Sequence, residues 1–357
     1  MNEPGLGGSF WPSERQKLLL RTATAGGEAS AEAWRRLRPQ LELDRLELGS
    51  FPVLPLVHRQ LDGLDIDDPY VPRLAGIRRR TWAMNQLGLD ALAPALRALE
   101  DAGAEPVVVG GWQFPAHYYG GDFGLRPVQG LEVLVRPAFA APRGAAGGVT
   151  HGGANGITCV LHQRFARDFS GPEREVEDLW ERTAELTLGE TRARMLAPTD
   201  ELVRVCLAGA RASEPPNVLW VADAIAVLQA SATSIDWERV VRHALRLRAM
   251  LRLRDALVYL RRELDAAVPD EAIRELEAHP PLRREALAHL KAGRSPRVVA
   301  TRFLHLTADR SLPAAVAALP TFLRDELGLK RRAQVPLEVV RRAALRIRVT
   351  RPTVEAR

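Results

Sequence analysis

The sequence contains no run of apolar residues that approaches the roughly 20 needed for a membrane-spanning helix. Its start, MNEPGLGGSFWPSERQ, lacks a basic segment followed by an apolar run, so we expect no signal peptide. There are only two cysteines, Cys159 and Cys206, and they have neither the spacing of a metal site nor that of a disulfide framework. These absences argue against membrane and disulfide-bonded secreted proteins and predict a reducing, cytoplasmic location.

Lysine is also scarce, since the chain has three lysines against 47 arginines, a bias that we attribute to genomic composition. Positive charge gathers at the end of the chain, where residues 330–357 contain nine Lys or Arg and two Glu, a net +7. The rest of the chain therefore carries about −1 of the total +6. No aromatic side chains alternate with these arginines to stack on bases, so we interpret the tail as a solvated basic helix and expect no nucleic acid partner.

Helices are predicted on both sides of a short β-rich section. Leucines recur at helical intervals over 13–63, and a second helical run covers about 73–102, where Gly103 is typical of a helix C-terminus. From about residue 173 onward the periodicity is again helical. The length of 357 residues, with 46% hydrophobic content, allows a sizeable core and predicts two domains or one domain with extensions.

Three short segments predict strands at 105–110, 129–135 and 157–164, because they are rich in β-branched residues and bounded by glycine or proline. We expect these strands to be neighbours in one sheet, with helices on one face. Residues 138–156 are rich in Gly, Ala and Pro and lack helical periodicity, so we predict an irregular loop there. The chain is therefore predicted to be an α+β protein.

The segment from Gly110 to Val135, GGWQFPAHYYGGDFGLRPVQGLEVLV, has the layout of a nucleotide-transfer site. A strand runs into a glycine pair, a short aromatic segment follows, and an arginine precedes the second strand. In such a site the second strand supplies carboxylates on one face, because side chains alternate along a strand, and these bind Mg²⁺. Here the second strand carries only one acid, Glu132.

The order of these segments resembles an uncharacterised nucleotidyltransferase family, a branch of the polymerase-β-like nucleotidyltransferase fold. LGSFPVLPLVHRQL, CVLHQRF and VLWVADAIAVLQASATSIDWERVV contribute to this similarity, which extends over roughly 13–270. It implies a small mixed nucleotidyltransferase-like sheet flanked by N-terminal helices and a C-terminal helical domain. We accordingly expect an N-terminal helical segment at 1–103, an α/β core at 104–195 and a C-terminal helical domain with the basic tail at 196–357.

The resemblance implies Mg²⁺-dependent transfer of a nucleoside monophosphate from an NTP to a hydroxyl or phosphate acceptor. It assigns nucleotide binding to Gly110 and Gly111, which would cradle the phosphates, and to Arg126, which would neutralise their charge. Family members usually have Lys-Gly where this chain has Gly110-Gly111. A bare glycine pair is also typical of an ordinary strand-to-helix turn, so both interpretations of the pair stay open.

Most of the expected metal ligands are missing. The family's Asp-x-Asp is replaced by Gly-Leu-Glu at 130–132, and its Asp-Leu-His by Val-Leu-His at 160–162. The resemblance leaves Glu132 as the candidate catalytic residue and metal ligand, whereas an ion pair, with Arg126 as the partner, is the alternative. A single carboxylate supplies too few ligands to hold the two metal ions, about 3.5–4 Å apart, that this chemistry uses.

Three further residues are candidates for accessory roles. Asp122 precedes the second strand and could reach the cleft, although an Asp after two glycines is also typical of a turn. Asp223 is a lone acid in the apolar helix LWVADAI, where an ion pair with a neighbouring arginine is the alternative to catalysis. His162 is expected near the cleft and could act as a base, whereas a hydrogen-bonded core histidine is the commoner role on a strand.

Two hypotheses about function follow. The loss of carboxylates favours a nucleotidyltransferase-family protein that is catalytically impaired or inactive, a pseudoenzyme that retains at most the binding of a nucleotide or of a peptide or protein partner. The alternative is an active enzyme with Mg²⁺ as cofactor and NTP as ligand. We expect no membrane partner in either case, and the sequence leaves the acceptor substrate and the base preference open.

Overall fold

The computed structural model describes most of the chain up to residue 282 and shorter segments beyond it. The described residues are 11–136, 139, 151–152, 158–163, 165, 177–211, 217–282, 285–286, 289, 299–300, 303–304, 307, 311–327, 329 and 332–341.

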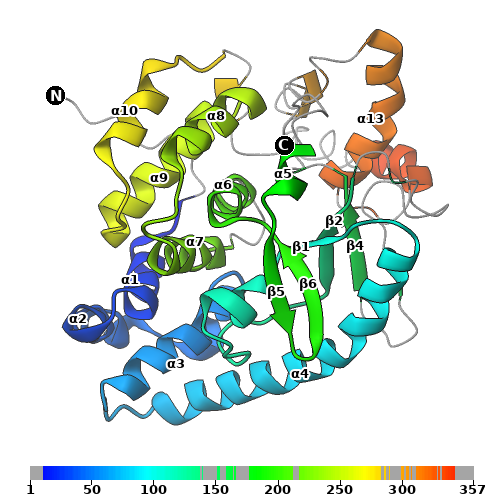
Figure 1. Cartoon of the computed structure of the whole chain (residues 1–357). Helices are drawn as coiled ribbons and strands as arrows, with labels where there is room; N and C mark the ends of the chain where they lie inside the picture. Colours follow the sequence, from blue (N-terminus) through cyan, green and yellow to red (C-terminus); the bar gives the residue numbers. More distant parts are fainter. Residues whose placement is uncertain are drawn as a thin grey trace, which may run out of the picture.

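The N-terminal part is helical, as the leucine spacing predicts. It contains α1 (Glu14–Thr24), α2 (Gly27–Leu37), α3 (Leu54–Gly63) and the long α4 (Val71–Asp101), with short 3₁₀ turns between α2 and α3 (Figure 1). A capping box fixes the start of α1, because Ser13 accepts from the backbone of Gln16 while the Gln16 side chain accepts from the backbone of Ser13.

The core is a six-stranded mixed sheet in which the three predicted strands are central neighbours. The spatial order is β3-β4-β2-β1-β6-β5, where β1 pairs antiparallel with β2 and parallel with β6, and β2 pairs parallel with β4. The strands are β1 (Val107–Val109), β2 (Leu131–Leu134), β3 (His151–Gly152), β4 (Thr158–His162), β5 (Ala184–Leu188) and β6 (Thr191–Met195). This arrangement confirms the α+β fold class, with a mixed sheet flanked by helices.

The hairpin of β5 and β6 corrects the prediction of continuous helix from about 173 onward. Residues 184–188 alternate between buried and more exposed positions along β5, and Gly189 turns the chain with φ +60° before β6. A short helix, α5 (Glu177–Glu181), precedes the hairpin. The alternation in AELTL was a strand signal of period two, which the surrounding helical pattern obscured.

The sheet is covered on both faces, which corrects the expectation of helices on one face only. Val108, Val133 and Leu161 share a buried cluster with Leu92 and Leu96 of α4. The alternate residues Val107, Val109 and Leu134 belong to the larger cluster of the N-terminal and C-terminal helices (Figure 1). Because β2 alternates, Glu132 lies on the same face as Leu134, toward the C-terminal helices.

Five C-terminal helices contribute residues to the cluster on that second face. They are α6 (Pro198–Gly209), α7 (Leu219–Ala230), α8 (Trp237–Leu247), α9 (Met250–Leu264) and α10 (Asp270–Ala278), and α13 (Leu312–Leu327) follows further along the chain. Every residue of α7 from Leu219 to Leu228 is buried, as its mostly apolar composition favours. Asp223 lies in the middle of this helix and is also buried.

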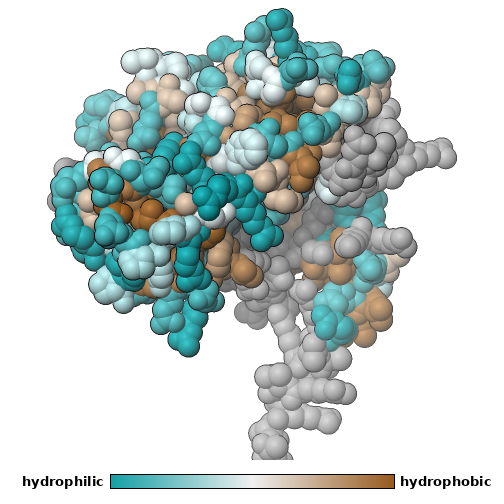
Figure 2. Space-filling view, turned by 90° about the horizontal axis from the view of Figure 1, so that it is seen from below, coloured by the Kyte–Doolittle hydropathy of each residue, from teal (hydrophilic) through white to brown (hydrophobic). Residues whose placement is uncertain are grey.

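The surface mixes hydrophilic residues with separate apolar patches, as Figure 2 shows for one face. Both cysteines are free and buried, in agreement with their interpretation as small core residues. Within the described part of the chain, no helix combines the length and the apolar character needed to cross a membrane. The predicted loop at 138–156 falls outside the described residues, apart from Phe139 and the two residues of β3.

Two glycines inside α4 give a matched test of the packing between this helix and the sheet. A Cβ added at Gly88 would lie 2.6 Å from the ring of the buried Trp112, whereas a Cβ at Gly76 meets nothing within 4 Å. We expect Gly88→Ala to destabilise the protein by roughly 1–3 kcal/mol through overpacking. Gly76→Ala should stabilise it by roughly 0.5–1 kcal/mol, because alanine is the better helix former. Chemical denaturation of both variants measures the difference, and equal effects would contradict this packing.

Candidate functional site

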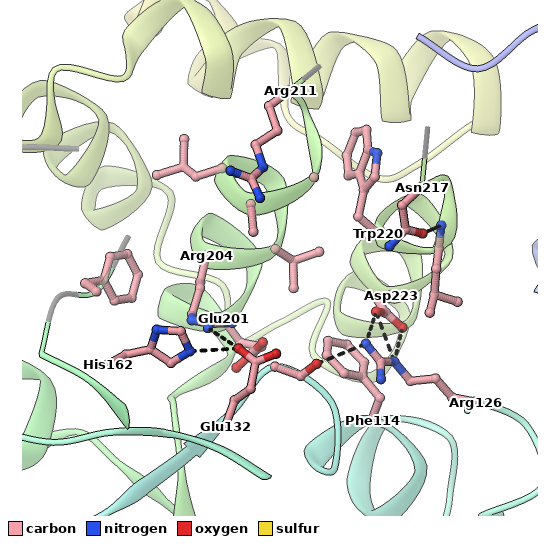
Figure 3. Close-up of a pocket in the computed structure, with 17 residues that line it drawn as sticks. Phe114, Arg126, Glu132, His162, Glu201, Arg204, Arg211, Asn217, Trp220 and Asp223 are labelled. Carbon is pink, nitrogen blue, oxygen red and sulfur yellow. Dashed lines mark hydrogen bonds and ion pairs between the residues drawn. The ribbon is translucent and has the colours of Figure 1, made fainter. Parts of the chain in front are cut away.

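A pocket of about 310 Å³ lies between the sheet and helices α6 and α7 (Figure 3). The ends of β1, β2 and β4 supply one wall, and the two helices supply the other. Its ionisable wall residues include Arg126, Glu132, His162, Glu201, Arg204 and Asp223, and its apolar ones include Phe114, Phe165 and Trp220. All predicted site residues except Gly111 and Asp122 line this pocket.

Glu132 is engaged by two basic side chains. It stands on β2 beside Val109 of β1 and Val160 of β4. Its Oε2 lies 2.7 Å from Nε2 of His162 and 3.7 Å from Nη2 of Arg204 on α6. His162 is buried, as expected of a hydrogen-bonded core histidine, whereas the Glu132 side chain is 40% exposed. The expected pairing of Glu132 with Arg126 is not found, because Arg126 binds Asp223 instead.

The described residues do not fit a pair of Mg²⁺ ions. Two residues before Glu132 stands Gly130, and a Cβ added there would lie 2.7 Å from the carbonyl oxygen of Thr158. The side chain of Val160, which lies on β4 beside Glu132, offers no oxygen ligand. No group of three or more His, Cys, Asp or Glu in the described part of the chain is arranged to hold a metal ion. Mg²⁺ requires several oxygen ligands in near-octahedral geometry, and the carboxylate of Glu132 is already paired.

The glycine pair allows close packing in the turn after β1. Gly110 has φ +84°, and a Cβ there would lie 2.6 Å from Cδ of Glu132. A Cβ at Gly111 would lie 2.9 Å from Nη1 of Arg126. The backbone N–H of Gly111 donates to Oε1 of Gln113, at 3.1 Å. These contacts give the pair a structural role, and its proposed role in phosphate binding stays a prediction.

Arg126 and Asp223 form a buried, bidentate ion pair. Nε and Nη2 of Arg126 donate to both carboxylate oxygens of Asp223 at 3.0–3.1 Å, and the hydroxyl of Tyr119 donates to Asp223 as well. Burial raises the pKa of Asp223, and the guanidinium beside it offsets part of that rise. Burial also opposes the charge of Arg126, but Asp223 outweighs it and raises the pKa of the guanidinium. The pair matches the alternative predicted for Asp223, an ion pair with an arginine.

Asp122 lies apart from the residues that line the pocket. Its Oδ2 accepts from Nη2 of Arg78 at 2.6 Å, and its Oδ1 accepts from the backbone N–H of Gly124 at 2.8 Å. The second contact is the local hydrogen bond expected of a turn-forming aspartate.

Glu201 is the residue of the pocket that sequence reasoning missed. Two acids in the first turn of a helix suit the helix dipole, so no local signal distinguishes Glu201 from Asp200. The Glu201 side chain is 0% exposed and lines the pocket from α6. Its Oε1 accepts from Nε2 of Gln113 at 3.0 Å, while its Oε2 has no hydrogen-bond partner among the described residues. Burial raises the pKa of Glu201 to about 7, although Arg204 and Gln113 favour the ionised form.

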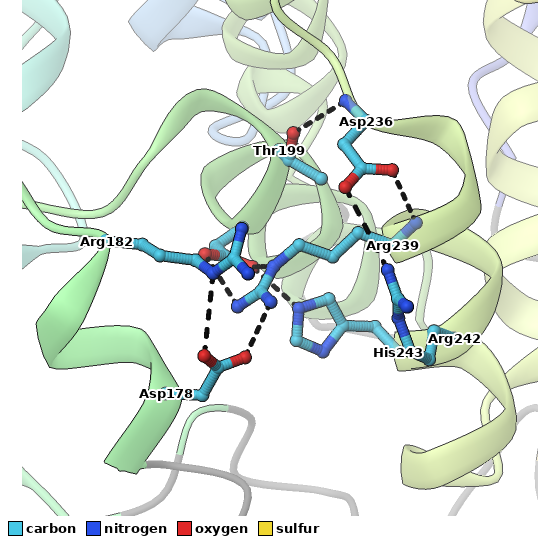
Figure 4. A network of polar contacts seen from close by, with 8 residues as sticks. Asp178, Arg182, Thr199, Asp236, Arg239, Arg242 and His243 are labelled. Carbon is cyan, nitrogen blue, oxygen red and sulfur yellow. Dashed lines mark hydrogen bonds and ion pairs between the residues drawn. The ribbon is translucent and has the colours of Figure 1, made fainter.

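The neighbouring Asp200 holds α6 in place through a buried network (Figure 4). Its carboxylate accepts from Nε of Arg239 at 2.8 Å and lies 2.6 Å from Nε2 of His243, both on α8. Nη1 of Arg239 also reaches Asp178 of α5, at 2.8 Å. Burial favours the neutral form of Asp200, but His243 and Arg239 outweigh it and hold the pKa of Asp200 below its usual range. The helix that carries Glu201 and Arg204 is therefore fixed to two neighbouring helices.

The buried carboxyl of Glu201 should make stability depend on pH. A carboxyl whose pKa is raised in the folded state stabilises the fold below its unfolded pKa, and this contribution is lost as the pH rises through the folded value. Between the ordinary 4.5 and about 7, the loss amounts to roughly 3 kcal/mol. We expect Glu201→Gln, which stays neutral, to exceed the wild type in stability at about pH 8 but to match it at about pH 4.5. Urea denaturation across this range measures the gap, and a gap independent of pH would contradict the assignment.

Residues 152–265 match the family model described as uncharacterised nucleotidyltransferase. The matched range runs from β3 to the residue after α9, so it includes His162, Glu201, Arg204 and Asp223 of the pocket. No curated protein and no solved structure was found to match the chain. The family match, on a helix-flanked mixed sheet, supports a nucleotidyltransferase-family assignment for this chain.

Proposed function

We propose that this chain is a catalytically impaired or inactive member of a nucleotidyltransferase family that binds a nucleotide, or a similar phosphorylated ligand, in the pocket between the sheet and α6 and α7. One observation carries the proposal. Glu132, which stands where a metal-binding carboxylate is expected, is paired with His162 and Arg204, and residue 130 has no side chain to assist it. Two-metal chemistry needs carboxylates that are available to the metal.

The basic residues of the pocket support binding of an anion. Arg204 of α6 lines it, together with Arg211, which follows that helix, and Arg126 (Figure 3). Arg126 is committed to Asp223 with three hydrogen bonds, whereas Arg204 is 3.7 Å from Glu132, beyond a normal hydrogen bond. A phosphate would compete with Glu132 for Arg204, because guanidinium groups bind phosphate oxygens in charge-assisted pairs. Phe114, Phe165 and Trp220 offer apolar surface for the rest of the ligand.

The alternative is an active, Mg²⁺-dependent nucleotidyltransferase. The position of Glu201 favours this alternative, because Glu201 is a second carboxyl in the same pocket. Among the described residues it has no basic partner within hydrogen-bond distance. Its raised pKa, about 7, opposes this role, since a metal ligand has to be ionised.

The activity test compares the wild type with Glu132→Ala. We expect purified protein with Mg²⁺ and any common NTP to release pyrophosphate no faster than the variant does. In a working two-metal site, removal of a ligand should cost several kcal/mol of transition-state stabilisation, which corresponds to orders of magnitude in rate. Pyrophosphate release measured for both proteins decides between the hypotheses. Mg²⁺-dependent turnover that Glu132→Ala abolishes would establish the active enzyme and overturn our proposal.

The binding test removes a positive charge from the pocket. We expect Arg204→Gln to weaken ATP binding roughly 10- to 100-fold, because a hydrogen bond to a charged group contributes about 1.5–3 kcal/mol. The control is Arg97→Gln, the same change at an exposed position on α4, which covers the other face of the sheet. It should leave the affinity unchanged. Isothermal titration calorimetry of the three proteins measures the effect, and equal losses in both variants would indicate nonspecific electrostatic binding.

A further inference from the structure

The hydrogen bonds around Gln113 determine where Glu201 carries a proton. The backbone N–H of Gly111 can only donate, so the side-chain atom of Gln113 that faces it has to be the acceptor Oε1. The amide Nε2 of Gln113 therefore faces Glu201 and donates to its Oε1, at 3.0 Å. Since Oε1 of Glu201 accepts in this bond, a proton on this carboxyl resides on the other oxygen, Oε2. That oxygen is buried and has no partner in the described part of the chain.

Charged and titratable groups approach Glu201 from every element around it. Arg204 lies on the same helix, and Asp223 comes from α7. Arg126 precedes β2, Glu132 lies on β2, His162 on β4 and Tyr118 in the short helix Phe114–Tyr118. Arg126 is paired with Asp223, and Arg204 lies 3.7 Å from Glu132, so the charges of these two pairs balance. An ionised Glu201 adds one negative charge to them, whereas a protonated Glu201 leaves them balanced.

We propose that Glu201 couples ligand binding in this pocket to proton uptake, so that an anionic, phosphorylated ligand binds to the form in which Glu201 carries a proton on Oε2. This inference rests on the proposed function, because it takes the pocket to be the ligand site. Glu201 acts here as a positioning residue: its protonation preserves the positive charge of Arg204 for the ligand.

The electrostatic reason is repulsion between like charges in a poorly solvated site. An ionised Glu201 would face both Asp223 and the incoming phosphate without a basic partner in hydrogen-bond contact. The ligand-free protein populates both forms of the carboxyl near neutral pH, because the pKa of Glu201 is about 7. A bound anion raises that pKa further, so by linkage the affinity falls as the pH rises through this value. A rise of about one pKa unit corresponds to a tenfold loss of affinity.

The test is calorimetric titration with ATP, without Mg²⁺, between about pH 6 and pH 8. Each titration is repeated in two buffers of different ionisation enthalpy, which reports the protons taken up. We expect the wild-type affinity to fall about tenfold more over this range than that of Glu201→Gln, with proton uptake near pH 7 reduced in the variant. Glutamine keeps an acceptor for Gln113 and a donor in place of the proton. The control is Glu238→Gln, at an exposed position on α8, which should behave as the wild type.

The comparison with Glu201→Gln isolates the carboxyl. Histidine side chains and terminal phosphates also titrate in this range, and the variant retains both. A thermal melt of each protein at about pH 6 confirms that the variants are folded. If ATP binds but the wild type and Glu201→Gln share the same pH dependence and proton uptake, the inference is wrong and the proposed function stands. If ATP fails to bind the folded wild type even at about pH 6, both are overturned.

Discussion

The buried ion pair between Arg126 and Asp223 is the interaction on which the rest of the pocket depends. It joins the chain ahead of β2 to the middle of α7, and the same guanidinium donates to the carbonyl oxygen of Gly110, at 3.3 Å. The turn after β1, the start of β2 and the wall helix α7 are therefore held by one residue. Removing one partner of such a pair leaves an uncompensated buried charge, which typically costs about 3–5 kcal/mol. Arg126, which could otherwise bind a ligand, thus holds the two walls of the pocket together.

Two adjacent acids on α6 show how surroundings decide the chemistry of identical groups. Asp200 points to α8 and is bound by Arg239 and His243, so it is ionised and structural. Glu201 points to the pocket, where one oxygen accepts from a neutral amide and the other has no partner among the described residues. Burial without a matching cation favours the neutral carboxyl. Asp200 anchors α6 to α8, and Glu201 therefore lies at the pocket without an ion-pair partner in hydrogen-bond contact.

The sequence predicted the outline of the fold better than the details of the site. Period and composition located the N-terminal helices and the three central strands, because these are local signals. The hairpin at 184–195 was missed between two helical patterns, although its alternation was visible. Partners such as Arg126 for Asp223 are 97 residues apart, and no local pattern specifies such a pair. Glu201 was missed for the same reason, since its unusual state arises from burial against the sheet, which only the tertiary structure reveals.

The geometry around Glu132 also indicates how much would have to change for this site to bind a metal ion. A carboxylate two positions before it would be needed, yet residue 130 has φ +152° and its Cβ would meet the carbonyl oxygen of Thr158 at 2.7 Å. An aspartate there requires the β2–β4 pair to move, so one substitution cannot restore the motif. Glu132 would in addition have to leave His162, at 2.7 Å. The backbone and the pairing of charges oppose metal binding together, which favours a pocket whose ligand brings its own negative charge.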